Sequence, residues 1–278
     1  MLIITEATIN AFASFLAERE YAAATISKYV HDLRLLMDYA PDGIPDRAAL
    51  VGFRAYLEQR GYSGASVNSM LGAVNLILAF LDSDWRLKYV RVQRKTFLPA
   101  DKELTQAEYE RMVRAAENDG NERLALLVQT LCALGIRVSE LRAVTVESLR
   151  TGEAHIQNKG KLRTILLPDA LCRKLAAYCK RRGIVSGSVF VTRTGRPLDR
   201  SNVWKMLKKL AALAKVLAKK VFPHNLRHLF ARTHYQKFKD VVRLADILGH
   251  SSVDTTRIYT ARSGKEERRQ LGQLRLVL

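Results

Sequence analysis

Apolar residues at helical spacing, with no strand-like alternation among them, place the strongest constraint on how the first part of this chain can fold. Residues 5–82 contain four such series, separated by short polar breaks. In the second series, over about residues 23–39, Ile26, Leu33 and Leu36 fall on one face, as an amphipathic helix requires. The pattern predicts a four-helix module whose apolar faces pack against one another.

Helix-start signals define the other boundaries of this module. Thr5 precedes the first helix, and Asp46 is expected to cap the third, which ends near Gly61. Either Ser63 or Ser66 opens the fourth helix. Taken alone, these residues fit an ordinary helical bundle as well as they fit a specialised binding module.

Basic residues are concentrated in the rest of the chain. The 278 residues include 46 Lys and Arg against 27 Asp and Glu, a formal charge of +19. Residues 1–90 hold 8 basic and 10 acidic side chains, and residues 91–278 hold 38 and 17. This distribution predicts a polyanionic partner that is bound mainly by the second part. The charges are interleaved with 48% hydrophobic residues, which argues against a disordered basic tail.

Length and cysteine usage indicate the broad class of protein. A chain of 278 residues favours two domains. Cys132, Cys172 and Cys179 form no CxxC pair and lie in apolar helical contexts, which is typical of buried thiols in a reducing cytosol. No basic region followed by a long apolar stretch opens the chain, and no apolar run approaches membrane-spanning length. We therefore expect a soluble cytoplasmic protein without a membrane partner.

A basic segment of mixed pattern, residues 86–100, is predicted to link a domain of residues 1–85 to a domain of residues 101–278. Five cations fall within ten residues of this segment. They could lie along a DNA backbone, or the segment could be a solvated connector. Thr105 and Glu108 then have the spacing of a capped helix start.

Arg137 follows Gly135, which is expected to end a helix of about residues 121–134. On the next short helix Arg137 and Glu140 share a face, so Glu140 can orient Arg137 or a neighbouring donor through an ion pair. Taken alone, the Arg-x-x-Glu pattern most often marks an exposed salt bridge.

A strand pattern replaces the helical one over residues 153–168. Two short strands flank the turn Asn158-Lys159-Gly160-Lys161, which predicts a β-hairpin with a lysine at its tip. Such a lysine could reach into a DNA groove and protonate a leaving 5′ oxygen; a charged turn residue is the simpler alternative. The chain as a whole is thus predicted to be mainly α-helical with one small hairpin.

A lysine-rich amphipathic helix is predicted over residues 204–221. Four leucines share one side, and six lysines occupy the other: Leu207, Leu210, Leu213 and Leu217, against Lys205, Lys208, Lys209, Lys215, Lys219 and Lys220. Helices of this kind can lie on an anionic membrane. Within a globular domain the apolar stripe has a core to enter, which favours a core helix with a side that faces solvent or DNA.

The segment His-Asn-Leu-Arg-His at residues 224–228 admits two interpretations. His-x-x-x-His is a zinc-ligand spacing, and His234 and His250 could complete such a site. Arg227 lies between the two histidines and would repel a cation, and no cysteine is close in sequence. A cluster of guanidinium and imidazole donors instead suits a phosphodiester in its transition state, which spreads negative charge over its oxygens.

Tyr259 lies nine residues after His250. A phenol with a pKa of about 10 is ionised to roughly one part in a thousand at neutral pH, so a tyrosine nucleophile requires activation. Neighbouring cations and hydrogen-bond donors can supply it by stabilising the phenolate. The available donors are His250, Arg137 and Arg227.

Several of these motifs resemble the tyrosine recombinase (phage integrase) family, in its simple Xer-like two-domain form. Leu-Gly-Ile-Arg-Val-Ser-Glu-Leu, His-x-x-Arg and Leu-Gly-His with a following Thr-Thr-x-x-Tyr occur in the family's order. Thr25, Tyr29, Asp32 and Leu33 resemble the start of its core-binding domain. The resemblance covers nearly the whole chain and implies a SAM-like helical core-binding domain followed by an α+β catalytic domain.

The resemblance also implies roles for the phosphate-binding and nucleophilic residues. Arg137 and Arg227 would clamp the scissile phosphate, with His250 as a third donor. Tyr259 would attack in line, giving a 3′-phosphotyrosyl intermediate and a free 5′ hydroxyl. Because the covalent link conserves the phosphodiester energy, no cofactor is expected, and the chain has neither a GxxxxGK[ST] loop nor a carboxylate cluster for two metals.

Proton transfer completes the implied mechanism. Lys159 would protonate the leaving oxygen, and His224 would assist proton transfer. In relatives the lysine lies in Gly-Lys-Gly, whereas here Asn158 replaces the first glycine and Lys161 is close by. The choice between Lys159 and Lys161 therefore stays open.

The implied partners are double-stranded DNA with inverted core sites and further copies of the same chain. The 19 residues after Tyr259 end in an apolar tail, which in relatives docks on a neighbouring protomer within a tetramer on DNA. Two alternatives remain: a type IB-like topoisomerase, which relaxes supercoils without exchanging partners, and a noncatalytic DNA-binding regulator. The compact helical N-terminal part favours a recombinase over the first, and the intact catalytic set argues against the second.

Overall fold

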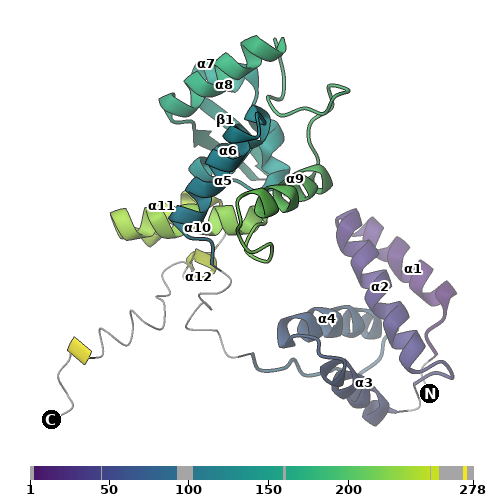
Figure 1. Ribbon diagram of the computed structural model, residues 1–278. Coiled ribbons are helices and arrows are strands. Elements are labelled where there is room, and N and C mark those ends of the chain that lie inside the picture. The colour runs from purple at the N-terminus through teal and green to yellow at the C-terminus, as the bar shows by residue number, and fades with distance from the viewer. Residues whose placement is uncertain are drawn as a thin grey trace. The chain divides into compact units, whose positions relative to one another are not determined.

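The computed structural model describes residues 3–44, 46–92, 103–158, 161–250, 252–256 and 272–273. The chain divides into two compact units, residues 1–94 and 95–278. Among these residues helices dominate both units, and one two-stranded antiparallel sheet lies in the second (Figure 1). The expected mainly α fold with a small hairpin is confirmed. Within the described residues, no helix has the length and apolar character needed to cross a membrane.

The described part of the first unit contains four helices, as the apolar spacing predicts: α1 (Glu6–Glu18), α2 (Ala23–Tyr39), α3 (Arg47–Gln59) and α4 (Gly64–Phe80). Their apolar faces form one core, in which Phe12, Leu33, Phe53 and Leu71 are fully buried. Burial of such side chains stabilises a fold by about 1.5–3 kcal/mol each.

Side-chain caps set the starts of three of these helices. The Thr5 hydroxyl accepts a hydrogen bond from the Thr8 amide, and Asp46 accepts one from the Ala49 amide. Ser63, rather than Ser66, caps α4, because its hydroxyl accepts from the Ser66 amide. Each cap satisfies an amide that the helix itself leaves without a partner.

The segment after α4 belongs to the first unit as far as residue 92, although the sequence predicts a linker from residue 86. The side-chain amide of Asn75 bonds with the backbone of Leu87, donating at 2.9 Å and accepting at 2.8 Å. Asn68 does the same with Val90, at 2.9 and 2.7 Å. Leu87 is also buried in the core. Two asparagines on α4 therefore hold residues 86–92 along that helix, a contact that the basic composition of the segment does not reveal.

Eleven elements of the second unit are described. They are α5 (Gln106–Asn118), α6 (Glu122–Leu134), η2 (Val138–Ala143), α7 (Val146–Thr151), β1 (Glu153–Asn158), β2 (Lys161–Leu166), α8 (Asp169–Arg182), α9 (Arg200–Leu213), α10 (Pro223–Phe238), α11 (Val241–Leu248) and α12 (Val253–Thr256). Helix α6 runs through the middle of the unit and packs against α5, α8 and α10 (Figure 1). It buries residues on every side, as expected of a helix enclosed by a core.

The hairpin has the predicted strands and pairs Ile156 with Arg163 and Ala154 with Ile165. Ala154, Ile156 and Ile165 are buried, whereas Leu162 and Leu166 are exposed. The register thus gives the sheet one face that packs on the core and one face toward solvent.

The helix predicted over residues 204–221 is shorter at its C-terminal end than expected. It ends at Leu213, and Lys215 has a left-handed φ of 51°. Leu207 and Leu210 are buried, but Leu213 and Leu217 are 51% and 57% exposed. Val216 enters the core in place of the expected leucines. Because no glycine or proline marks the end of α9, the apolar periodicity of the sequence continues past the residue at which the helix ends.

Two ion pairs join the start of the second unit to the region of α10. The Lys220 ammonium, expected on the polar side of the preceding helix, is buried and donates to Glu108 at 2.9 Å. Arg232 on α10 pairs with Glu103 and donates to the Leu104 carbonyl at 2.7 Å. Pro223 lies in the first turn of α10 as predicted. These contacts fix α10, which carries His224 and Arg227.

Candidate active site

Arg137 stands at the junction between α6 and η2. Gly135 ends α6 in the left-handed conformation, with φ of 59°, and a Cβ there would come within 2.3 Å of the Phe230 ring. The Arg137 amide and Nη1 both donate to the Glu140 carboxylate, at 2.8 and 3.0 Å. The expected Arg137–Glu140 ion pair is confirmed, but Glu140 is buried rather than part of an exposed bridge.

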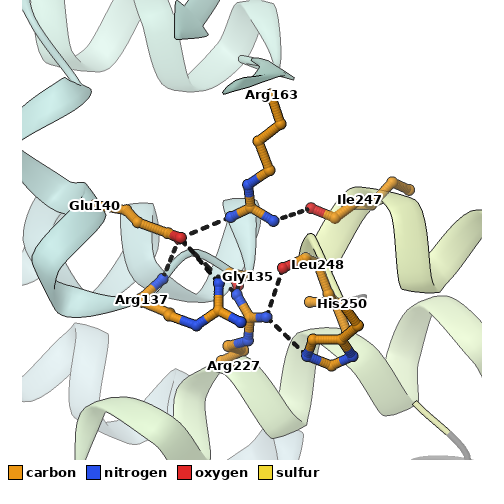
Figure 2. Close-up of polar contacts among 8 residues, drawn as sticks. All are labelled: Gly135, Arg137, Glu140, Arg163, Arg227, Ile247, Leu248 and His250. Carbon is orange, nitrogen blue, oxygen red and sulfur yellow. Dashed lines mark hydrogen bonds and ion pairs between the residues drawn. The ribbon is translucent and has the colours of Figure 1, made fainter. Parts of the chain in front are cut away.

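Glu140 also binds two further guanidinium groups. Arg163 of β2 donates to Glu140 Oε2 at 2.7 Å, and Arg227 Nη1 lies 4.0 Å from the same oxygen. Figure 2 shows the three guanidinium groups converging on this carboxylate. One negative charge therefore faces three positive charges, and the excess favours an added anion.

Arg227 is the largest fully buried side chain among the described residues, at 1% exposure. Its Nη1 donates to the Gly135 carbonyl and its Nη2 to the Leu248 carbonyl, both at 2.7 Å (Figure 2). These carbonyls lie at the C-terminal ends of α6 and α11, where the helix dipole is negative. Burying a cation is costly unless it is paired and hydrogen-bonded, and the two helix ends with Glu140 provide that compensation.

His250 is hydrogen-bonded on both ring nitrogens. Its Nε2 lies 3.0 Å from Arg227 Nη2, and its Nδ1 lies 2.8 Å from Thr256 Oγ1. Because a guanidinium only donates, Nε2 accepts, and Nδ1 carries the proton toward Thr256. Burial, together with the cations Arg227, Arg137 and Arg163, lowers the pKa of His250 to about 4. The ring is therefore neutral at pH 7, and a nearby anion would raise its pKa and favour the protonated, donating form.

Two more histidines lie one turn apart on α10. The rings of His224 and His228 meet edge to face, with centroids 4.4 Å apart. Partial burial and the cations Arg227 and Arg137 lower the pKa of His224, which keeps contact with solvent. Burial, followed by the nearby His224, lowers the pKa of His228 to about 4. Among the described residues, no group of three His, Cys, Asp or Glu side chains is placed to hold a metal.

Gly249, in the Leu-Gly-His motif, allows Arg163 to pass close to the backbone. It has φ of 64°, and a Cβ there would lie 2.3 Å from Arg163 Nη1. Arg163 Nη1 donates to the Ile247 carbonyl at 2.9 Å. The glycine is thus required both by its left-handed conformation and by the approach of this arginine.

The structure brings together Arg137, Arg227 and His250 of the predicted set, with His224 near enough to affect the His250 pKa. Lys159 and Tyr259 lie outside the described residues. The described chain continues to Asn158 on one side of Lys159 and to Thr256 on the near side of Tyr259.

Sequence reasoning missed Arg163. A signal for it was present, because strand alternation places Arg163 on the same face as Ile165, which enters the core. A cation at an inward-facing position needs a buried partner. Glu140 is that partner.

Comparisons with known proteins agree with this fold and cluster. Residues 102–266 match the phage integrase family, and residues 9–84 match the phage integrase N-terminal SAM-like domain. The chain therefore belongs to the phage integrase family, the tyrosine recombinases. Tyrosine recombinase XerA of Pyrococcus furiosus is 31% identical over 268 residues, which cover 92% of this chain and 90% of that protein. Tyrosine recombinase XerD of Listeria monocytogenes is 30% identical over 278 residues, covering 91% and 93%.

Solved structures share the fold at lower identity. A lambda integrase dimer bound to a COC′ core site superposes with a TM-score of 0.74 at 16% identity, covering 92% of this chain and 95% of the other. XerH site-specific recombinase bound to difH substrate gives a TM-score of 0.68 at 22% identity, covering 96% and 84%. The two-domain architecture implied by the motifs is thus shared with tyrosine recombinases.

Proposed function

We propose that this protein is a site-specific DNA recombinase, which cleaves and rejoins DNA strands through a 3′-phosphotyrosyl intermediate. The observation that carries the proposal is the cluster of three guanidinium groups around the buried carboxylate of Glu140, with His250 hydrogen-bonded to one of them. Preorganised donors with an excess of positive charge suit a transition state that spreads negative charge over phosphate oxygens. Membership of the tyrosine recombinase family supports the same reaction.

In the proposed first step the Tyr259 oxygen attacks the scissile phosphorus. A bond forms between that oxygen and phosphorus, and the bond from phosphorus to the 5′ oxygen breaks. Lys159 gives its proton to the departing oxygen, and the phenol proton passes to the imidazole of His224, whose lowered pKa keeps it neutral. Attack by a 5′ hydroxyl of a partner strand reverses the step, so the number of phosphodiester linkages is conserved and no external energy source is required.

Arg137 and Arg227 serve the phosphate in different ways in this proposal. The Arg137 side chain is 36% exposed, so it has surface left for a phosphate oxygen, whereas Arg227 is 1% exposed. Arg227 orients the site through the helix ends and His250. We propose that, when the phosphate binds, Arg227 and the protonated His250 donate charge-assisted hydrogen bonds to its oxygens.

The proposed partner is double-stranded DNA with inverted core sites, held by a core-binding domain of residues 1–85 and a catalytic domain of residues 101–278. We propose that the protein acts on this DNA in the cytoplasm. Four copies would assemble on two sites, each passing its apolar tail to a neighbour. Deletion of residues 271–278 should weaken cooperative assembly on DNA and reduce recombination; equal activity of the truncated chain would contradict tail exchange.

The reaction is tested with the purified protein, without metal, on nicked duplexes that carry candidate sites. The wild-type chain should form an SDS-stable protein–DNA adduct, and Tyr259→Phe should form none. Tyr235→Phe on α10 is the matched control and should retain the adduct. Adduct formation with relaxation of supercoils but without strand exchange would favour a topoisomerase, and specific DNA binding without any adduct would favour a noncatalytic regulator.

A further inference from the structure

We propose that Arg163 is a positioning residue that holds strand β2 of the hairpin against η2 and α11, and that the proposed general acid Lys159, four residues before it in the sequence, depends on this contact for its catalytic role. The inference rests on the proposed function. Arg163 lies outside the family motifs, and its proposed role is distinct from that of the phosphate clamp.

Arg163 connects three elements through one planar guanidinium group. It extends from β2, donates through Nη2 to Glu140 of η2 at 2.7 Å, and donates through Nη1 to the Ile247 carbonyl of α11 at 2.9 Å (Figure 2). The Arg163 side chain is 17% exposed and that of Glu140 is 3% exposed. A forked donor in such a position fixes direction as well as distance.

The outer part of the hairpin depends on this contact. Ala154, Ile156 and Ile165 bury the base of the sheet in the core. Arg163 is the next inward-facing position toward the tip, opposite Ile156. Among the hairpin side chains that the structure describes, Arg163 is the one that hydrogen-bonds to other elements. Lys159 lies four residues before this anchor in the sequence.

The phosphate clamp has attachments of its own. Arg137 holds Glu140 through both its amide and its Nη1. Arg227 is fixed by the Gly135 and Leu248 carbonyls. Loss of the Arg163 side chain therefore removes the polar anchor of the hairpin but leaves these contacts in place. The expected defect is in protonation of the leaving oxygen rather than in binding of the phosphate.

A pair of substrates separates these two defects. One carries an ordinary phosphodiester at the cleavage site, and the other carries sulfur in place of the bridging 5′ oxygen. The sulfur leaves as a thiolate, which requires no proton, because a thiol is far more acidic than an alcohol. Single-turnover adduct formation is measured on both substrates, together with DNA affinity.

Arg163→Gln should form adduct about 10- to 100-fold more slowly than wild type on the oxygen substrate, since a misplacement of about 1 Å can cost that much. On the sulfur substrate its rate should return to within about 3-fold of wild type, with DNA affinity nearly unchanged. A slow rate on both substrates would overturn the proposal, because it would place the defect in the clamp or the fold. A normal rate on the oxygen substrate would overturn it as well.

Three further variants calibrate the experiment. Lys159→Ala should show the same rescue by sulfur, and Arg137→Gln should stay slow on both substrates. Arg181→Gln removes an arginine from a surface pair with Glu122 and should behave as wild type.

If Arg163→Gln does not fold, Arg163→Lys keeps the charge but loses the forked pair of donors, and the same rescue by sulfur is expected of it. A wild-type chain that forms no adduct on either substrate would contradict the proposed function itself.

Discussion

Arg227 and Arg137 carry the same charge next to the same carboxylate, but they differ in burial. The Arg227 side chain is 1% exposed and bonds two helix ends, whereas the Arg137 side chain is 36% exposed. Removing one partner from a buried hydrogen-bonded pair leaves uncompensated groups, at a cost of about 3–5 kcal/mol. The two arginines should therefore differ in their effect on stability more than in their effect on catalysis.

Arg227→Gln should lower the free energy of unfolding of the second unit by about 3–5 kcal/mol, and Arg137→Gln by about 1 kcal/mol or less. Both should slow adduct formation severely. The measurement is denaturant unfolding in a Trp85→Phe background, where Trp204 reports on the second unit. Equal destabilisation by the two substitutions would contradict the structural role assigned to Arg227.

The depressed histidine pKa values make the second unit sensitive to acid. His228 and His250 have pKa values of about 4, whereas an unfolded chain binds the proton near pH 6.5. Between these values the unfolded state binds more protons, so stability should fall as the pH drops from about 6.5 toward 4. His228→Asn should make this dependence shallower when unfolding is followed by Trp204 fluorescence. An unchanged pH dependence would mean that His228 is protonated as readily in the folded protein as in the unfolded chain.

At the level of elements, the helices with clear end signals were predicted well. Thr5, Asp46, Ser63 and Thr105 each accept the hydrogen bond expected of a cap. The predicted C-terminal end of α9 is wrong, because Lys215 adopts a left-handed conformation that its residue type does not indicate. Likewise, the Arg137–Glu140 pair could be predicted because it is local, whereas Arg163 reaches Glu140 across 23 residues of sequence, and only folding brings them together.

The ion pair between Lys220 and Glu108 fastens α5 to the segment before α10. Their side chains are 11% and 14% exposed. Lys220→Met should lower the free energy of unfolding of the second unit by about 1–3 kcal/mol, because Glu108 stays partly buried without its cation. Arg114→Met, which breaks the exposed 3.7 Å pair with Glu110, should cost no more than about 0.5 kcal/mol. Urea unfolding measures the loss in free energy of unfolding for both variants. Equal losses would show that the Lys220–Glu108 pair contributes no more to stability than a surface pair.

For the molecule as a whole, the uneven charge predicts how it holds DNA. Residues 91–278 carry 38 basic and 17 acidic side chains, against 8 and 10 in residues 1–90. If about 6–10 phosphates are neutralised, affinity should fall by roughly 10³–10⁵ between 50 and 200 mM salt. Fluorescence anisotropy of labelled duplex over a salt series measures the slope. A slope of log affinity against log salt shallower than about −2 would indicate few phosphate contacts. It would contradict the prediction that the basic second unit binds DNA mainly through its phosphates.

The central claim is that the proposed reaction joins DNA covalently to one side chain, as a phosphotyrosyl adduct. The most direct measurement is to trap the adduct on a nicked duplex, digest protein and DNA, and locate the nucleotide-bearing peptide by mass spectrometry. The nucleotide should be attached through its 3′ phosphate to Tyr259. Attachment to a different residue, or through a 5′ phosphate, would contradict the proposed mechanism.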